Sequence, residues 1–112
     1  MSIEKIYAQL ACSDLERSIN WFECLFGRPP DARPMSGLAE WHHGNTAGLQ
    51  VFENPQAAGS GTLTLIVDNL GNEHARLADM GLKPSDLELA DSTNLVRLRD
   101  PDKNLIVFAQ PG

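Results

Sequence analysis

The chain has 112 residues, of which 42% are hydrophobic and 21% are charged. This composition is typical of one globular domain with a single core, and it argues against disorder, collagen and fibrous repeats. The formal net charge of −6 disfavours a nucleic-acid binder, because a protein that follows phosphates needs a basic patch. No apolar stretch approaches the roughly 20 residues of a membrane span, and no signal peptide is visible, so we expect a cytoplasmic protein without a membrane partner.

The first half of the chain predicts a strand, a helix and three more strands. Residues 6–11 alternate between two faces with the period of a strand. Residues 13–16 have the capping-box pattern of a helix start, and Gly27 is a natural helix stop. The apolar face of this helix consists of Leu15, Ile19, Phe22 and Phe26. Three short strands are expected at about 32–36, 38–43 and 47–53.

The second half repeats this order. Residues 62–67 form a β-rich run, Asp68-Asn69 can cap a second helix, and Gly81 ends it. The apolar positions of this helix include Leu70, Leu77 and Met80. Three strands are again expected, at about 87–91, 94–99 and 104–110. The predicted fold is α+β, with tandem βαβββ modules, about 1–56 and 61–112, that form a curved mixed β-sheet with an open concave cleft.

This order of elements and four stretches of sequence resemble the vicinal oxygen chelate superfamily, which contains glyoxalase I, bleomycin-resistance proteins and extradiol dioxygenases. The stretches are residues 13–22 with 25–27, 48–52, 65–70 and 99–102 running into the last strand. The superfamily's usual Asp-Pro-Asp-Gly-Asn turn has Lys103 in place of the glycine. The resemblance implies the glyoxalase/bleomycin resistance fold and a homodimer.

The resemblance also locates four metal-ligand positions, and this chain carries weak donors at them. Residue by residue, they fall at Tyr7 with Gln9 two residues later, at Gln50 or its neighbour Val51, at Thr62 and at Val107. Valine has no lone pair, threonine and neutral tyrosine are weak ligands, and two neutral amides do not match an imidazole-and-carboxylate set. We therefore predict that the usual metal site is missing and that the protein needs no cofactor.

Three histidines offer no clear alternative site. His42 and His43 adjoin on an expected strand, with Glu40 nearby. Neighbouring strand residues point to opposite faces, so these two histidines do not readily chelate one ion, although His43 could face the cleft. His74 has the spacing expected of a histidine at the boundary of the second helix.

Motifs for nucleophilic catalysis are also missing. The sequence contains no GxSxG elbow, P-loop or HExxH motif. Cys12 and Cys24 have no CxxC spacing and no adjacent basic residue, which is typical of two reduced, unreactive thiols. A metal-free acid–base reaction that uses His43 stays open, because geometry is not visible in a sequence.

The strand alternation places ten residues in the cleft. They are Tyr7, Gln9, Trp41, His43, Gln50, Phe52, Thr62, Thr64, Arg97 and Val107. This mixture of aromatic, apolar and hydrogen-bonding groups is typical of a small-molecule pocket. Trp41 and Phe52 could stack on a flat ligand, or they could pack a dimer interface or the cleft floor. Arg97 could pair with a carboxylate or phosphate, or it could be a solvated strand residue.

Three functions compete on these grounds. The preferred hypothesis is a metal-independent protein that sequesters or senses a small organic ligand, similar to the bleomycin-resistance branch of the superfamily. The alternative is an enzyme, a metal-dependent lyase or an extradiol-type dioxygenase with unusual ligands, in which a metal would polarise adjacent oxygens of the substrate. The third is a purely structural dimer without a ligand. The missing donors favour the first.

Overall fold

A computed structural model describes all 112 residues of the protein as two consecutive βαβββ modules. The first module contains β1 (Ile6–Cys12), α1 (Leu15–Phe26), β2 (Ala32–Met35), β3 (Leu38–His43) and β4 (Ala47–Glu53). The second contains β5 (Thr62–Ile66), α2 (Leu70–Asp79), β6 (Glu88–Ala90), β7 (Thr93–Arg99) and β8 (Leu105–Pro111). The predicted α+β class and the order of elements are confirmed, with strand ends that differ by at most one residue.

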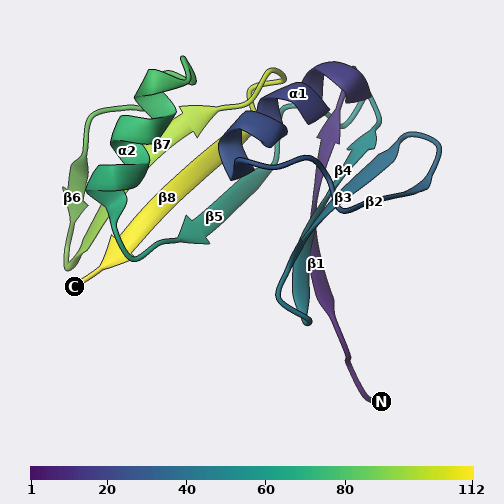
Figure 1. Cartoon of the computed structure of the whole chain (residues 1–112), viewed down its shortest axis with the longest axis horizontal. Helices are drawn as coiled ribbons and strands as arrows, with labels where there is room; N and C mark the ends of the chain where they lie inside the picture. Colours follow the sequence, from purple (N-terminus) through teal and green to yellow (C-terminus); the bar gives the residue numbers. More distant parts are fainter.

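Each module builds its own mixed four-stranded sheet. The strand order is β1-β4-β3-β2 in the first sheet and β5-β8-β7-β6 in the second. In both, the first strand runs parallel to its neighbour and the other pairs are antiparallel. The two sheets do not share a hydrogen-bonded ladder, and Figure 1 shows them spreading apart from the region around α1. The one curved sheet expected from the sequence is therefore two sheets.

The helix boundaries follow local chemistry, with one difference from the prediction. At the start of α1, the side chain of Asp14 accepts a hydrogen bond from the N–H of Arg17, so Asp14 is the cap rather than Ser13. The Ser13 hydroxyl instead donates to Asp102 of the other module. The helix ends at Gly27 as predicted, and Asn69 caps α2 by accepting from the N–H of Asn72.

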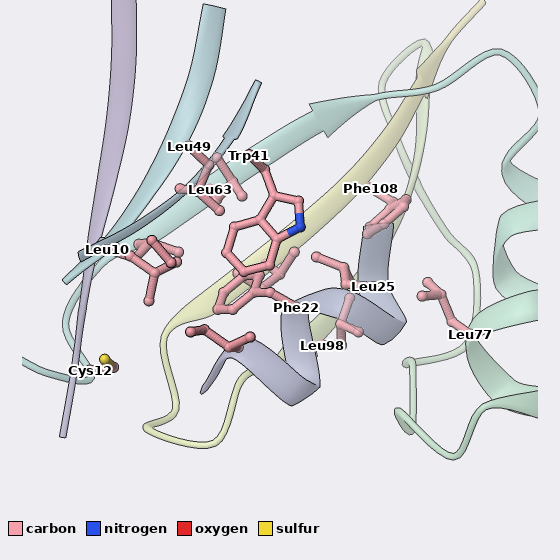
Figure 2. Close-up of a cluster of buried hydrophobic side chains, with 14 of the residues drawn as sticks. Leu10, Cys12, Phe22, Leu25, Trp41, Leu49, Leu63, Leu77, Leu98 and Phe108 are labelled. Carbon is pink, nitrogen blue, oxygen red and sulfur yellow. The ribbon is translucent and has the colours of Figure 1, made fainter. Parts of the chain in front are cut away.

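One core lies between the inner faces of the two sheets. It joins α1 to both modules, and its members include Leu10, Leu49, Val51, Leu63, Val96, Leu98, Ile106 and Phe108 from the strands. Figure 2 shows Trp41 and Phe22 at the centre of this core, between side chains from the two sheets. Because both inner faces meet the same core, each sheet turns its other face away from it. We call these outward surfaces the first and second open faces.

Besides the bond from Ser13 to Asp102, two further polar links hold the modules together. Asn104, which is 1% exposed, donates from Nδ2 to the carbonyl of Ala11 at 3.0 Å, and its Oδ1 accepts from the N–H groups of Gly59 and Gly61. The guanidinium of Arg76 on α2 donates to the carbonyls of Cys24 and Leu25 at the end of α1. The linker and both helices are thereby fixed relative to one another. 

Neither helix has the length and apolar character that crossing a membrane requires.

Candidate functional site: a polar row on the first open face

Strand register determines which predicted residues share the first open face. Gln9 of β1, Gln50 of β4 and Glu40 of β3 lie side by side in one row. Directly opposed residues of neighbouring strands project to the same face, and so do residues two apart on one strand. Tyr7 and Phe52 therefore flank this row on the same face.

A continuous hydrogen-bond chain connects the row. Gln9 Nε2 donates to Gln50 Oε1 at 3.1 Å, and Gln50 Nε2 donates to Glu40 Oε2 at 2.7 Å. His42 Nε2 lies 2.9 Å from Glu40 Oε1. Glu40 is only 8% exposed, and hydrogen bonds from His42 and then from Gln50 hold its pKa below the usual value. The row thus contains a largely buried carboxylate that is ionised at neutral pH.

The carboxylate fixes the direction of every bond in the chain. An ionised carboxylate only accepts, so Gln50 must direct its NH₂ group to Glu40 and its oxygen to Gln9. Gln9 must then direct its own NH₂ group to Gln50, which leaves Gln9 Oε1 as an acceptor without a protein partner. His42 likewise must carry its proton on Nε2 to donate to Glu40, so a neutral His42 has an accepting Nδ1.

The ring of Tyr7 packs over Gly48 of the neighbouring strand β4. A Cβ atom at Gly48 would come within 2.4 Å of Tyr7 Cε1 and 2.8 Å of the carbonyl oxygen of Trp41. The absence of a side chain at Gly48 lets the phenol ring approach His42, with 6.0 Å between the ring centroids. An aromatic ring with a hydroxyl is thereby placed beside the polar row.

Two of the ten predicted residues lie on the other side of the first sheet. Trp41 pairs with Leu49 and is 2% exposed, with its ring against Phe22 and Phe26 of α1. Its indole N–H donates to the carbonyl of Arg28. The prediction that Trp41 shares a face with Gln50 is wrong: the side chain belongs to the core and is not available for stacking.

His43 shares that inner side but remains exposed at the end of the sheet. It lines an opening of about 220 Å³ between the modules, together with Phe26 and Leu65. The face assignment of the two histidines is therefore the reverse of the prediction, with His42 on the open face. Glu40 and His42 are the site residues that the sequence argument missed.

The other four predicted residues lie on the second open face. Thr64, Val107 and Arg97 form one row across β5, β8 and β7, and Thr62 lies two residues from Thr64. Arg97 is paired with Glu88, with 3.1 Å between Nε and Oε2. None of the five cavities is lined by residues of both rows. One chain therefore does not bring all of the predicted pocket together.

The donor set does not fit a divalent metal ion. Gln50 has its oxygen and its NH₂ group engaged within the row, and Val107 has no donor atom. Thr62 and Thr64 lie on the opposite sheet from Tyr7 and Gln9. No group of three or more His, Cys, Asp or Glu residues is placed to hold a metal.

The remaining candidates for chemistry have structural roles. Cys12 is buried, and burial raises the pKa of its thiol, so a reactive thiolate is disfavoured. Cys24 is also free and is half-buried on α1. The Nε2 atom of His74 lies 3.0 Å from the carbonyl oxygen of Ser85, which agrees with the boundary position predicted for it.

Comparison with solved structures places the fold in the glyoxalase/bleomycin-resistance class. The glyoxalase / bleomycin resistance protein from Catenulispora acidiphila DSM 44928 matches with a TM-score of 0.88 and 26% identity, over 97% of this chain and 99% of that chain. TnmS3, an antibiotic binding protein from Streptomyces sp. CB03234, matches with a TM-score of 0.85 and 22% identity, over 100% and 99%. No protein-family model and no curated protein matches the sequence.

A third similar structure is a bleomycin-binding protein complexed with bleomycin. Its TM-score is 0.81 at 20% identity, over 97% of this chain and 99% of that chain. The structure of the present chain is therefore that of a glyoxalase/bleomycin-resistance fold protein, and similar structures include antibiotic-binding proteins.

The lowered pKa of Glu40 predicts a specific pH dependence of stability. A carboxylate whose pKa is lower in the folded state stabilises the protein above its unfolded pKa, near 4.5, and that stabilisation is lost as the pH falls through the folded value. Glu40→Gln should therefore lower the free energy of unfolding by about 1 kcal/mol at pH 6. The difference from the native protein should shrink below pH 4.5 in urea unfolding. A constant difference across this range would contradict the role given to the carboxylate, and Glu4→Gln controls for the loss of one charge.

Proposed function

We propose that this protein is a metal-independent binding protein that holds a small organic ligand on its open faces. The observation that carries the proposal is the polar row, in which the buried carboxylate of Glu40 fixes the orientation of two amides and a histidine. Pre-oriented polar groups beside aromatic side chains are typical of small-molecule sites. The names of two similar structures, an antibiotic binding protein and a bleomycin-binding protein, support the same class of function.

The direction of the hydrogen bonds defines the chemistry of the ligand. Gln9 Oε1 and the Nδ1 atom of a neutral His42 accept, so the matching ligand groups are N–H or O–H donors. Phe52 is half-buried, and it lines a cavity of about 290 Å³ with Gln9 and Leu38. A flat ring against Phe52, with amide or hydroxyl donors directed to the row, would use both features.

A second copy of the chain would complete the site. Each open face is a single wall, and the residues of the second open face, Thr62, Thr64, Arg97 and Val107, lie on the opposite sheet from the polar row. In a homodimer, the first open face of one protomer can oppose the second open face of its partner. Such an arrangement would turn two exposed walls into two equivalent clefts. Arg97 could then leave Glu88 to pair with an anionic group of the ligand.

Ligand screening of metal-stripped protein tests the proposal. Bleomycin and other aromatic antibiotics, added after treatment with EDTA, should raise the melting temperature because a ligand that binds only the folded state stabilises it. For a ligand that binds, Phe52→Ala and Gln9→Ala should each weaken affinity by about fivefold or more, corresponding to roughly 1 kcal/mol. Met80→Ala, an exposed apolar residue outside both faces, should leave the affinity unchanged.

Two outcomes would overturn this function. Binding or turnover that appears only with one equivalent of a divalent metal would favour the lyase or dioxygenase alternative. A dimer in sedimentation experiments that binds none of the compounds, and whose association is weakened by Phe52→Ala, would favour a structural dimer in which the open faces pack on each other.

A further inference from the structure

A groove of about 470 Å³ lies at the outer edge of β7, away from the polar row. The edge is free there because β6 is short: the ladder between the two strands reaches only the pair Glu88 and Leu95. Beyond it, Ser85 alone contacts the edge, donating its N–H to the carbonyl of Arg97 and accepting the N–H of Arg97 on its hydroxyl. The groove begins where these contacts end.

Backbone alternation leaves an unpaired donor in this groove. The N–H and C=O groups of successive strand residues face opposite edges. Arg97 uses its N–H and C=O toward Ser85, so Arg99 directs its N–H and C=O to the same edge, where no strand reaches it. Lys83 lies two residues before Ser85, has a φ of +58° in the left-handed region, and also lines the groove.

Two positively charged side chains without a carboxylate partner also line the groove. Lys83 and Arg99 both line it, and neither is in an ion pair, although Arg97 is paired with Glu88. The one acidic residue that lines the groove, Asp100, is 4% exposed. Its oxygens accept from the N–H groups of residues 102 and 104 and from the Asn104 amide, so its carboxylate is engaged within the turn. In a chain with a net charge of −6, this is a local excess of positive charge.

Apolar side chains form the rest of the wall. Trp21 of α1 is half-buried and lines the groove together with Leu82 and Leu98. A volume of about 470 Å³ exceeds that needed for an inorganic ion and lies in the range of small-molecule sites.

We propose that this groove is a second ligand site, which binds small organic anions that combine an oxyanion head with an aromatic or aliphatic body. The oxyanion, a carboxylate or a sulfonate, accepts hydrogen bonds from the backbone N–H of Arg99, its guanidinium and the ammonium group of Lys83. The body lies against Trp21 and Leu82. This site is distinct from the polar row; it shares the lining residue Arg97 with the second open face, and it does not depend on the function proposed above.

A pair of matched probes tests the proposal. 8-Anilinonaphthalene-1-sulfonate carries an aromatic body and one sulfonate, and N-phenyl-1-naphthylamine has the same body without the charge. In calorimetric titrations of the native protein, the sulfonate should bind at least about tenfold more tightly than the neutral compound. In ¹H–¹⁵N spectra, the sulfonate should shift the Arg99 amide resonance, and the neutral probe should leave it in place.

Variants separate the groove from other apolar surfaces. Lys83→Met combined with Arg99→Met should weaken binding of the sulfonate by about tenfold or more and leave binding of the neutral probe within about twofold. Lys83→Arg combined with Arg99→Lys should retain most of the affinity. Arg33→Met, which removes one positive charge on β2 of the first module, should have little effect. Equal affinity for the two probes, an unshifted Arg99 amide, or an equal loss on Arg33→Met would overturn the proposal.

Discussion

Asn104→Ala is expected to lower the free energy of unfolding by about 3 kcal/mol or more. The amide of Asn104 makes four hydrogen bonds: two accepted from Gly59 and Gly61, and two donated to Ala11 and Asp100. Alanine leaves two backbone N–H groups and one carbonyl without their partner. Each buried or half-buried polar group that loses its partner costs about 1–3 kcal/mol. Urea unfolding followed by circular dichroism measures the loss.

The contrast with two other variants makes this test specific. Asn94→Ala, at an exposed position on β7, should change stability by less than about 0.5 kcal/mol. Asn104→Asp keeps the shape but replaces a donor by a carboxylate beside Asp100, so it should be at least as destabilising at neutral pH. A loss below about 1 kcal/mol for Asn104→Ala would mean that the linker rearranges and that the amide does not hold the modules together.

Trp41→Ala should cost about 3–5 kcal/mol of stability, the range found when a large aromatic side chain is removed from a core. The ring is 2% exposed and lies 5.9 Å from the ring of Phe22 and 5.7 Å from that of Phe26. The indole N–H donates to the carbonyl of Arg28. Trp41→Phe removes this hydrogen bond but keeps most of the packing, so it should lower the free energy of unfolding by only about 1–2 kcal/mol. Thermal and urea unfolding distinguish the two substitutions.

This prediction separates a core role from a ligand-stacking role. If Trp41 stacked on a ligand, truncation would weaken ligand binding and leave the stability of the free protein nearly unchanged. We expect the opposite, with Phe52 as the aromatic residue whose loss weakens binding. A Trp41→Ala variant as stable as the native protein would contradict the core role and would favour a ligand contact for the indole.

The sequence predicts most of the fold because local signals at each element agree. The left-handed Gly27 ends α1, and Asn69 caps α2, as the pattern of the chain indicates. The cap of α1 is different because Ser13 is recruited by Asp102, a residue 89 positions away. Met80 is 45% exposed rather than buried; α2 ends at Asp79, and Met80 is its C-cap residue. The first of these differences arises from a contact beyond the reach of local patterns.

The candidate site is less predictable, since it depends on the register of one hairpin. Residues 38–43 do not alternate strictly between polar and apolar side chains. The pattern alone therefore does not decide whether Glu40 or Trp41 faces outward. The structure pairs Glu40 with Gln50 across the turn, which places Trp41 beside Leu49 in the core. A signal was available: the short turn at residues 44–46 sets this register once β3 and β4 are treated as a hairpin.

The position of the two open faces could not be derived from either module alone. Both inner faces meet one core, in which α1 lies against β3 and β4 and α2 lies against β7 and β8; the two sheets spread apart, and the two rows of predicted residues are separated (Figure 1). A pattern of alternation says which face of a sheet is apolar, but not how two sheets are placed around a shared core.

The bond from Arg76 to the end of α1 has a consequence for attempts to recombine the two halves. The carbonyls of Cys24 and Leu25 obtain their donors from a guanidinium that belongs to the other module. A chimaera that exchanges the C-terminal half for that of another protein would need a long cationic side chain at the equivalent place. Without such a side chain, the carbonyls of Cys24 and Leu25 at the end of α1 would have no donor from the grafted half. The shared order of elements therefore does not make the two halves interchangeable.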